Sequence, residues 1–189
     1  DVYKRQDLAE LRATIVAAGE GLAEFIDSET ILKETVKNLY DGIPVDEVFK
    51  SAILSARALV EKDPAYSQVT ARLLLHTIRK EVLGEEVSQD GMGARYAEYF
   101  PTFIARGIEG GLLSPELASY DLTKLGKALN AKRDLQFGYL GLQTLYDRYF
   151  LHIRGTRIEL PQVFFMRVAM GLALRLSLIH ISEPTRLLS

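Results

Sequence analysis

The sequence of 189 residues predicts a mainly α protein with one β-hairpin near residues 150–160. Apolar residues recur every three or four positions along most of the chain, which is the period of an amphipathic helix. Glycine, proline and acidic residues separate these stretches at places where helices usually start and stop. Alternation of apolar and polar residues, the period of a β-strand, is confined to one short segment.

Each helix in the first half of the chain has its own boundary signals. Asp27 or Ser28 is a suitable N-cap, Pro44 a suitable first residue, and Gly42 and Gly84 suitable C-terminal stops. An aromatic-rich helix follows, and we expect Pro101 to interrupt it or to begin a new turn. The expected helices cover residues 7–22, 28–39, 44–59, 65–83 and 96–108.

The second half begins with short helices near Ser114–Glu116 and over Asp121–Leu129. A helix over Phe137–Tyr149 is apolar on two faces, so we expect both faces to be buried. The hairpin follows, with strands over 150–153 and 157–160 and its turn near Gly155. The last expected helix covers 162–174 after Pro161, and it is apolar nearly all round except for Arg167.

The two ends of the chain are expected to be foreign to the protein. The DNA string GAT GTG TAT AAG AGA CAG encodes residues 1–6, and its reverse complement encodes residues 176–181. Two ends that translate opposite strands of one oligonucleotide indicate a sequencing adaptor read through as protein. We therefore expect residues 1–6 and 176–189 to be adaptor sequence, and residues 7–175 to be a segment of a longer protein. The alternative is a natural amphipathic tail.

Composition excludes several classes of function. The formal net charge is −2, so there is no basic excess to suggest direct binding of nucleic acid. The apolar stretches are short and are interrupted by Arg, Asp or His, so no transmembrane span is expected. There is no cysteine, which excludes disulfides, thiolate metal sites and thiyl chemistry within this chain.

Isolated polar residues on apolar segments favour structural roles. His76 lies on a leucine-rich helix, where packing is the expected role, and His152 alternates with apolar residues and is expected to face solvent or a partner. Arg167 is expected to pair with a carboxylate or with helix carbonyls, and Glu159 is a candidate partner. Three tyrosines at helical spacing are expected to pack in the core rather than to transfer a radical: Tyr139, Tyr146 and Tyr149.

Three groups of motifs occur in a specific order over most of residues 7–174. They are Asn38–Ile43 with the helix through Leu59; Asp63–Tyr66 with Thr70–Lys80; and Arg133–Tyr139 with Thr144–Leu145, Tyr149–Leu151, Glu159–Gln162 and Phe165–Val168. Together they resemble the amino-terminal part of the large (alpha, catalytic) subunit of class I ribonucleotide reductase. The resemblance implies that residues 7–59 are the end of an ATP-cone and that residues 60–175 are the N-terminal all-α domain, leading into an α/β barrel absent from this chain.

The resemblance also implies a function for the longer protein: reduction of ribonucleoside diphosphates to deoxyribonucleoside diphosphates for DNA synthesis in the cytoplasm. It implies ATP and dATP as allosteric effectors and a thioredoxin-type or glutaredoxin-type reductant. The implied protein partners are a second large subunit and a small (beta) subunit whose metal centre generates the radical. The catalytic cysteines of the family are not in this chain, so the fragment itself is expected to be inactive.

The expected cone lacks part of the family's nucleotide site. Its Lys-Arg-Asp-Gly type motif would precede Asp7, and two positions that are polar in many members are Val45 and Phe49 here. Lys80 matches a basic position of the family and could meet a phosphate as a point charge, although a solvated lysine at a helix end is the default. Residues 7–22 need not belong to the cone; the alternative is that they belong to a diverged or duplicated cone in which allosteric binding has decayed.

A non-catalytic helical module that docks a protein partner is the competing interpretation of the same elements. The two interpretations differ in the sequence expected to follow. The reductase predicts a barrel with a cysteine-bearing strand, whereas the interaction module does not.

Overall fold

The computed structural model describes residues 2–182, with side chains placed over 8–174 and at Leu176. It is mainly helical with a single two-stranded hairpin among the described residues, as the sequence predicts. The chain forms two compact units, the first from Asp1–Val87 with Arg133–Tyr149 and the second from Ser88–Lys132 with Phe150–Ser189.

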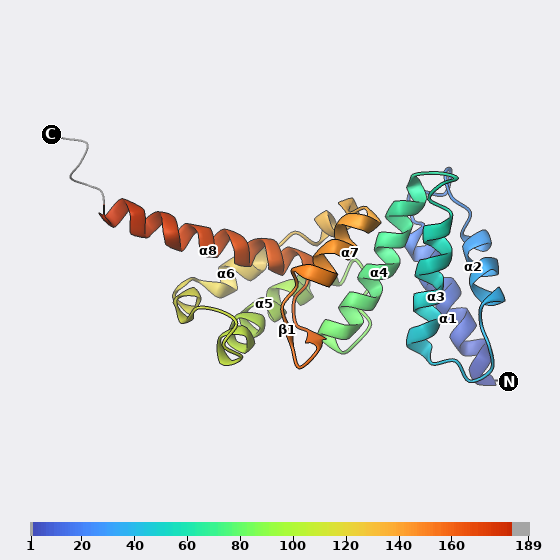
Figure 1. The fold of residues 1–189 in the computed structure, drawn as a ribbon, viewed down its shortest axis with the longest axis horizontal. Coiled ribbons are helices and arrows are strands. Elements are labelled where there is room, and N and C mark those ends of the chain that lie inside the picture. Colours follow the sequence, from blue (N-terminus) through green and yellow to red (C-terminus); the bar gives the residue numbers. More distant parts are fainter. Residues whose placement is uncertain (1, 183–189) are drawn as a thin grey trace. The chain divides into compact units, whose positions relative to one another are not determined.

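The first unit is a helical bundle built around one long helix. Helices α1 and α3 pack on α4, and α7 packs on the same helix (Figure 1). The bundle consists of α1 (Val2–Ala18), α2 (Ser28–Lys37), α3 (Val45–Ala58), α4 (Ala65–Leu83) and α7 (Tyr139–Arg148). Leu73, Leu75 and Ile78 of α4 are no more than 1% exposed, so this helix supplies much of the core.

The predicted caps fix the ends of these helices. The Asp27 carboxylate accepts a hydrogen bond from the backbone N–H of Glu29 at 3.0 Å, satisfying one of the free donors at the start of α2. Gly84 adopts φ +73° and its N–H donates to the carbonyl of Lys80 at 2.9 Å. This left-handed residue ends α4 and turns the chain back on itself.

A buried ion pair joins α4 to the segment that precedes α7. Arg79 Nη2 lies 2.9 Å from Asp134 Oδ2, and the two side chains are 7% and 0% exposed. Asp134 belongs to the 3-10 helix η2 (Ala131–Gln136). The pair holds two segments that are distant in sequence, and loss of either partner would leave a buried charge.

The second unit packs α5 (Met92–Glu109) against α6 (Leu122–Ala128) and the start of α8 (Pro161–Ser182). The short helix η1 (Pro115–Ser119) links α5 to α6, and its Leu117 is buried. Aromatic residues of α5 form the centre of the core, because Tyr96, Phe100 and Phe103 are fully buried.

The expectation that Pro101 interrupts its helix is wrong, because α5 runs through it. Proline has no N–H, so the carbonyl of Ala97, four residues earlier, loses its usual helical donor. That carbonyl lies against Gly126 of α6, where a Cβ would stand only 2.8 Å from the oxygen. Close packing of α5 on α6 therefore accompanies the proline, and the helix stays continuous.

Three other expectations need correction. The strands are only two residues each, β1 (His152–Ile153) and β2 (Thr156–Arg157), although the N–H of Ile158 still donates to the carbonyl of Leu151 at 2.9 Å beyond them. Arg154 and Gly155 form the turn at φ +51° and +84°, as a tight two-residue hairpin requires.

Helix α7 buries only one face, since Leu140 on the other is 73% exposed. Helix α8 continues past the expected end at Leu174 to Ser182.

Candidate functional site

The candidate residue Lys80 lies in the last turn of α4, at the side of the first unit where α3 approaches α4. Its ammonium Nζ is 2.9 Å from Glu86 Oε1, and the two side chains are 37% and 41% exposed. Glu86 reaches Lys80 because the chain reverses at Gly84. The charge of Lys80 is thus already paired within the chain.

Phe49 and His76 form the apolar side of this site. The Phe49 ring is 4.8 Å from the His76 ring, centroid to centroid, and Lys80 Nζ lies 5.7 Å from the centre of the Phe49 ring. A cation at this distance from an aromatic ring is attracted to its face. Phe49 is 6% exposed, so the ring fills the space between α3 and α4. Val45, one turn earlier, is 42% exposed.

Carboxylates of the chain itself already stabilise the positive charge of Lys80. The hydrogen bond to Glu86 raises the pKa of Lys80, and the charges of Glu10 and Asp46 act in the same direction. The same contact with Lys80 lowers the pKa of Glu86. Burial lowers the pKa of His76, whose Nε2 has no hydrogen-bond partner and lies 3.9 Å from Glu86 Oε1. At neutral pH the site therefore contains one lysine cation and a neutral imidazole.

Sequence reasoning selected Lys80 but missed the role of Glu86 and the contact between Phe49 and His76. The signal for the first was the acidic pair after Gly84, since a left-handed C-terminal glycine returns the chain toward the last turn of its helix. Spacing places His76 beside Lys80, because they are four residues apart on one face of α4. The contact of His76 with Phe49 joins two helices and has no such local signal.

The predicted pairing of Arg167 with Glu159 is confirmed, whereas the expectation for the tyrosines holds only in part. Arg167 Nε lies 2.6 Å from Glu159 Oε1 and its Nη2 lies 3.2 Å from Glu159 Oε2. His152 is exposed, and Tyr139 is 7% exposed and packs in the core. Tyr146 is half-buried and its hydroxyl donates to Glu81 Oε2 at 2.7 Å. Tyr149 is 55% exposed, contrary to the expectation for that residue.

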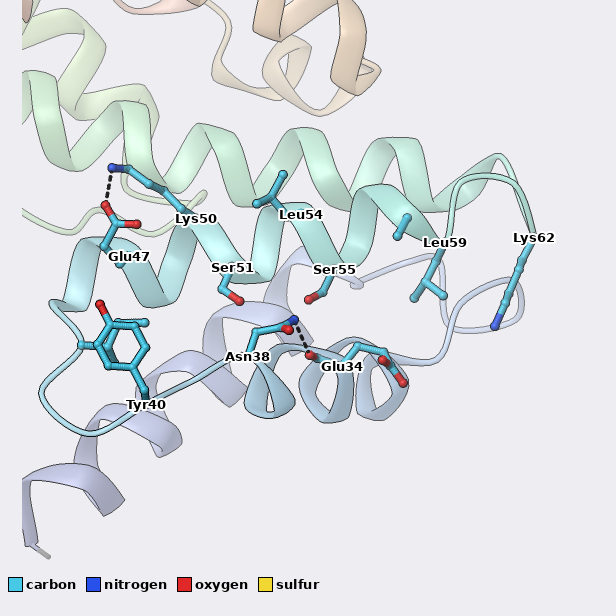
Figure 2. A pocket seen from close by; sticks show the side chains of 12 residues that line it. Glu34, Asn38, Tyr40, Glu47, Lys50, Ser51, Leu54, Ser55, Leu59 and Lys62 are labelled. Atoms are coloured by element: carbon cyan, nitrogen blue, oxygen red, sulfur yellow. Dashed lines mark hydrogen bonds and ion pairs between the residues drawn. The ribbon is translucent and has the colours of Figure 1, made fainter.

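A groove of about 730 Å³ lies between α2 and α3 of the first unit. Figure 2 shows Tyr40 at one end and Lys62 at the other, with Ser51 and Ser55 along its side. Lys50 is paired with Glu47 at 2.8 Å, and the side chain of Asn38 donates to the carbonyl of Glu34 at 3.0 Å. Its lining combines both signs of charge with apolar side chains and shows no preference for one kind of ligand.

The structure gives no indication of metal chemistry over the part of the chain that it describes. No group of three or more His, Asp or Glu side chains is arranged to hold a metal ion there. A search of the same described residues finds no helix both long and apolar enough for a membrane span.

Comparison with known proteins identifies relatives over most of the chain. Residues 135–179 match the family model for the ribonucleotide reductase all-alpha domain. The ribonucleoside-diphosphate reductase subunit alpha of Chlamydia muridarum (strain MoPn / Nigg) is 41% identical over 168 residues, covering 88% of this chain and 16% of the relative. The corresponding protein of Helicobacter pylori (strain ATCC 700392 / 26695) is 36% identical over 136 residues, covering 70% and 16%.

A phage protein extends the set of relatives. The ribonucleoside-diphosphate reductase subunit alpha of Enterobacteria phage T4 is 29% identical over 161 residues, covering 81% of this chain and 19% of the relative. The chain therefore spans less than a fifth of the length of these relatives. Over most of its length the chain is similar to ribonucleotide reductase large subunits, and within it residues 135–179 match their all-alpha domain.

Proposed function

We propose that this chain is part of a protein that reduces ribonucleoside diphosphates to deoxyribonucleoside diphosphates. The observation that carries the proposal is the 41% identity to a ribonucleoside-diphosphate reductase subunit alpha across 88% of the chain. The sequence has no cysteine, so the radical-bearing cysteine and the reducing cysteine pair of this chemistry belong to the remainder of the protein. The described part supplies a scaffold and a candidate regulatory site.

The proposed partners follow from that chemistry. A small subunit with a metal centre supplies the radical, and a thioredoxin-type or glutaredoxin-type protein returns the reducing equivalents. A second large subunit completes the assembly, and the cytoplasm is the proposed location. The exposed apolar residues of α8 support a further intramolecular contact with the barrel that follows in the longer protein. Phe165, Val168 and Leu172 are 48%, 38% and 61% exposed.

We propose that residues 1–6 and 176–189 are adaptor sequence, as expected from their coding strings. The C. muridarum relative aligns over 168 residues, about the length of the segment 7–175. The all-alpha match ends at residue 179, just past that boundary, where the apolar helical pattern continues. Asp1 and residues 183–189 lie outside the described residues.

At the level of single residues, we propose that Lys80 is the point where the first unit contacts a phosphate of an allosteric nucleotide, ATP or dATP. Its ammonium is partly exposed at the surface of α4. An ammonium group binds phosphate oxygens as a compact point charge. The neighbouring Phe49 ring adds an apolar surface beside the charge.

The experiment that tests the function starts from the source DNA, which is read outward past both ends of the chain. The reductase predicts an open reading frame that continues from Leu174 into a barrel with cysteine-bearing strands. The complete protein is then assayed for conversion of CDP to dCDP with its small subunit and a thioredoxin system, and a variant without the barrel cysteine is the control. A frame that instead encodes residues 176–186 and stops would refute the proposal and favour the helical interaction module.

A further inference from the structure

We propose that Glu86 is a built-in competitor for phosphate at Lys80, so that a nucleotide binds there only when the Glu86 carboxylate leaves. The inference rests on the proposed role of Lys80 and adds a regulatory contact to it. It explains why a lysine that could meet a phosphate is held 2.9 Å from a carboxylate of its own chain.

The backbone around Gly84 makes Glu86 a local and persistent competitor. Glu86 is six residues from Lys80, and the left-handed turn at Gly84 places it beside the last turn of α4. An anion tethered at so short a distance has a high effective concentration at its partner. A phosphate from solution must therefore displace a carboxylate that is already held beside Lys80 by the chain.

The surrounding charges strengthen this competition. The carboxylates of Glu10 and Asp46 also raise the pKa of Lys80, so that one ammonium faces several acids. The last turn of a helix carries partial negative charge from its free carbonyls, which further disfavours a phosphate. A polyphosphate approaching this site meets repulsion unless the carboxylate nearest to Lys80 is neutralised or moved.

The side chains beneath Lys80 are packed, whereas Glu86 beside it lies at the surface. Phe49 and His76 are in ring contact and largely buried, so these two side chains are held in place beneath the ammonium group of Lys80. Glu86 is 41% exposed and also interacts with Glu10, and it can leave both contacts for solvent without opening the core. Glu86→Gln should therefore keep the fold and remove the competing charge.

The test measures binding of ATP and of inorganic tripolyphosphate by isothermal titration calorimetry at low, constant ionic strength. An exposed ion pair contributes at most about 1 kcal/mol, so we expect Glu86→Gln to tighten binding about fivefold. Glu47→Gln is the matched control, because Glu47 pairs with Lys50 at 2.8 Å on α3, in a surface pair that is more exposed than that of Lys80 and Glu86. This control should change binding less than twofold, and adding Lys80→Met to Glu86→Gln should abolish the gain.

Other outcomes separate the two proposals. Suppose that the single variant Lys80→Met binds the probes more weakly than the unmodified chain, while Glu86→Gln binds them no differently from Glu47→Gln. Lys80 is then a nucleotide contact, but Glu86 is not its competitor. If neither probe binds any variant, or if Lys80→Met has no effect, both proposals are wrong. Circular dichroism of each variant must match that of the unmodified chain for the comparison to count.

Discussion

Replacement of either Glu159 or Arg167 is expected to destabilise the second unit strongly, and the two replacements are expected to differ in how the loss depends on pH. Glu159 is fully buried, and its carboxylate accepts two hydrogen bonds from Arg167 and one from the backbone N–H of Leu151 at 2.9 Å. Removal of one partner of a buried pair typically costs 3–5 kcal/mol, because the other charge is left without compensation. We expect Glu159→Gln to cost about 3 kcal/mol, since the amide oxygen can still accept from Leu151.

Arg167→Met should produce a loss that depends on pH. Burial raises the pKa of Glu159, and Arg167 opposes that shift, so the variant raises this pKa further. The folded state then holds a proton that the unfolded state releases above its ordinary pKa near 4.5. Stability of the variant therefore falls as the pH rises from 4.5 through the folded pKa, and part of the loss at pH 7 is recovered at pH 5.

The assay is guanidinium unfolding followed by circular dichroism at pH 5 and pH 7, with hydrogen exchange of the Leu151 amide as a local report. Glu98→Gln is the control, because Glu98 pairs with Arg95 at the surface and should cost less than about 1 kcal/mol. The double variant Glu159→Gln with Arg167→Met should cost less than the two single losses combined. Equal losses for Arg167→Met at both pH values, or losses no larger than that of the control, would refute this reasoning.

Three further outcomes are expected. Burial lowers the pKa of His76, so its contribution to stability is present above pH 6.5 and is lost as the pH falls through the folded pKa. An NMR titration of His76 should give a midpoint below 6.5. The variant His76→Gln should show a weaker dependence of its unfolding free energy on pH in that window. Gly126→Ala should cost about 1–3 kcal/mol, because the new Cβ would lie 2.8 Å from the Ala97 carbonyl, whereas Gly141→Ala, with nothing within 4 Å, should be neutral or stabilising in thermal melts. The chain should self-associate through α8, and Leu172→Lys should reduce its light scattering; a monodisperse, cooperatively melting monomer would contradict this.

The sequence was most informative where one signal dominated. Helix α4 has the predicted bounds 65–83, because its long apolar stripe ends at Gly84, which adopts the left-handed conformation that stops a helix. Arg167 and Glu159 could be paired in advance, since a charge on an apolar helix needs a nearby partner.

Other features depend on contacts between elements and could not be read from local patterns. Helix α5 runs through Pro101, and the close approach of Gly126 to the Ala97 carbonyl could not be inferred from either helix alone. The exposure of Leu140 on α7 depends on which neighbours are available to cover that face. At the candidate site, the sequence identified Lys80 by its place on a helix, but its partner follows from the path of the chain after Gly84.

The contact between the Ala97 carbonyl and Gly126 also constrains how these positions can change over evolution. Pro101 removes the helical donor to that carbonyl, whose oxygen lies where a side chain at position 126 would begin, so a residue without a side chain fits there. Replacement of the proline first lets the carbonyl return to its own helix and relaxes the demand on position 126. Replacement of the glycine first meets an oxygen that has nowhere to go. Of the two mutational orders, only the one that begins at position 101 is expected to pass through a stable intermediate.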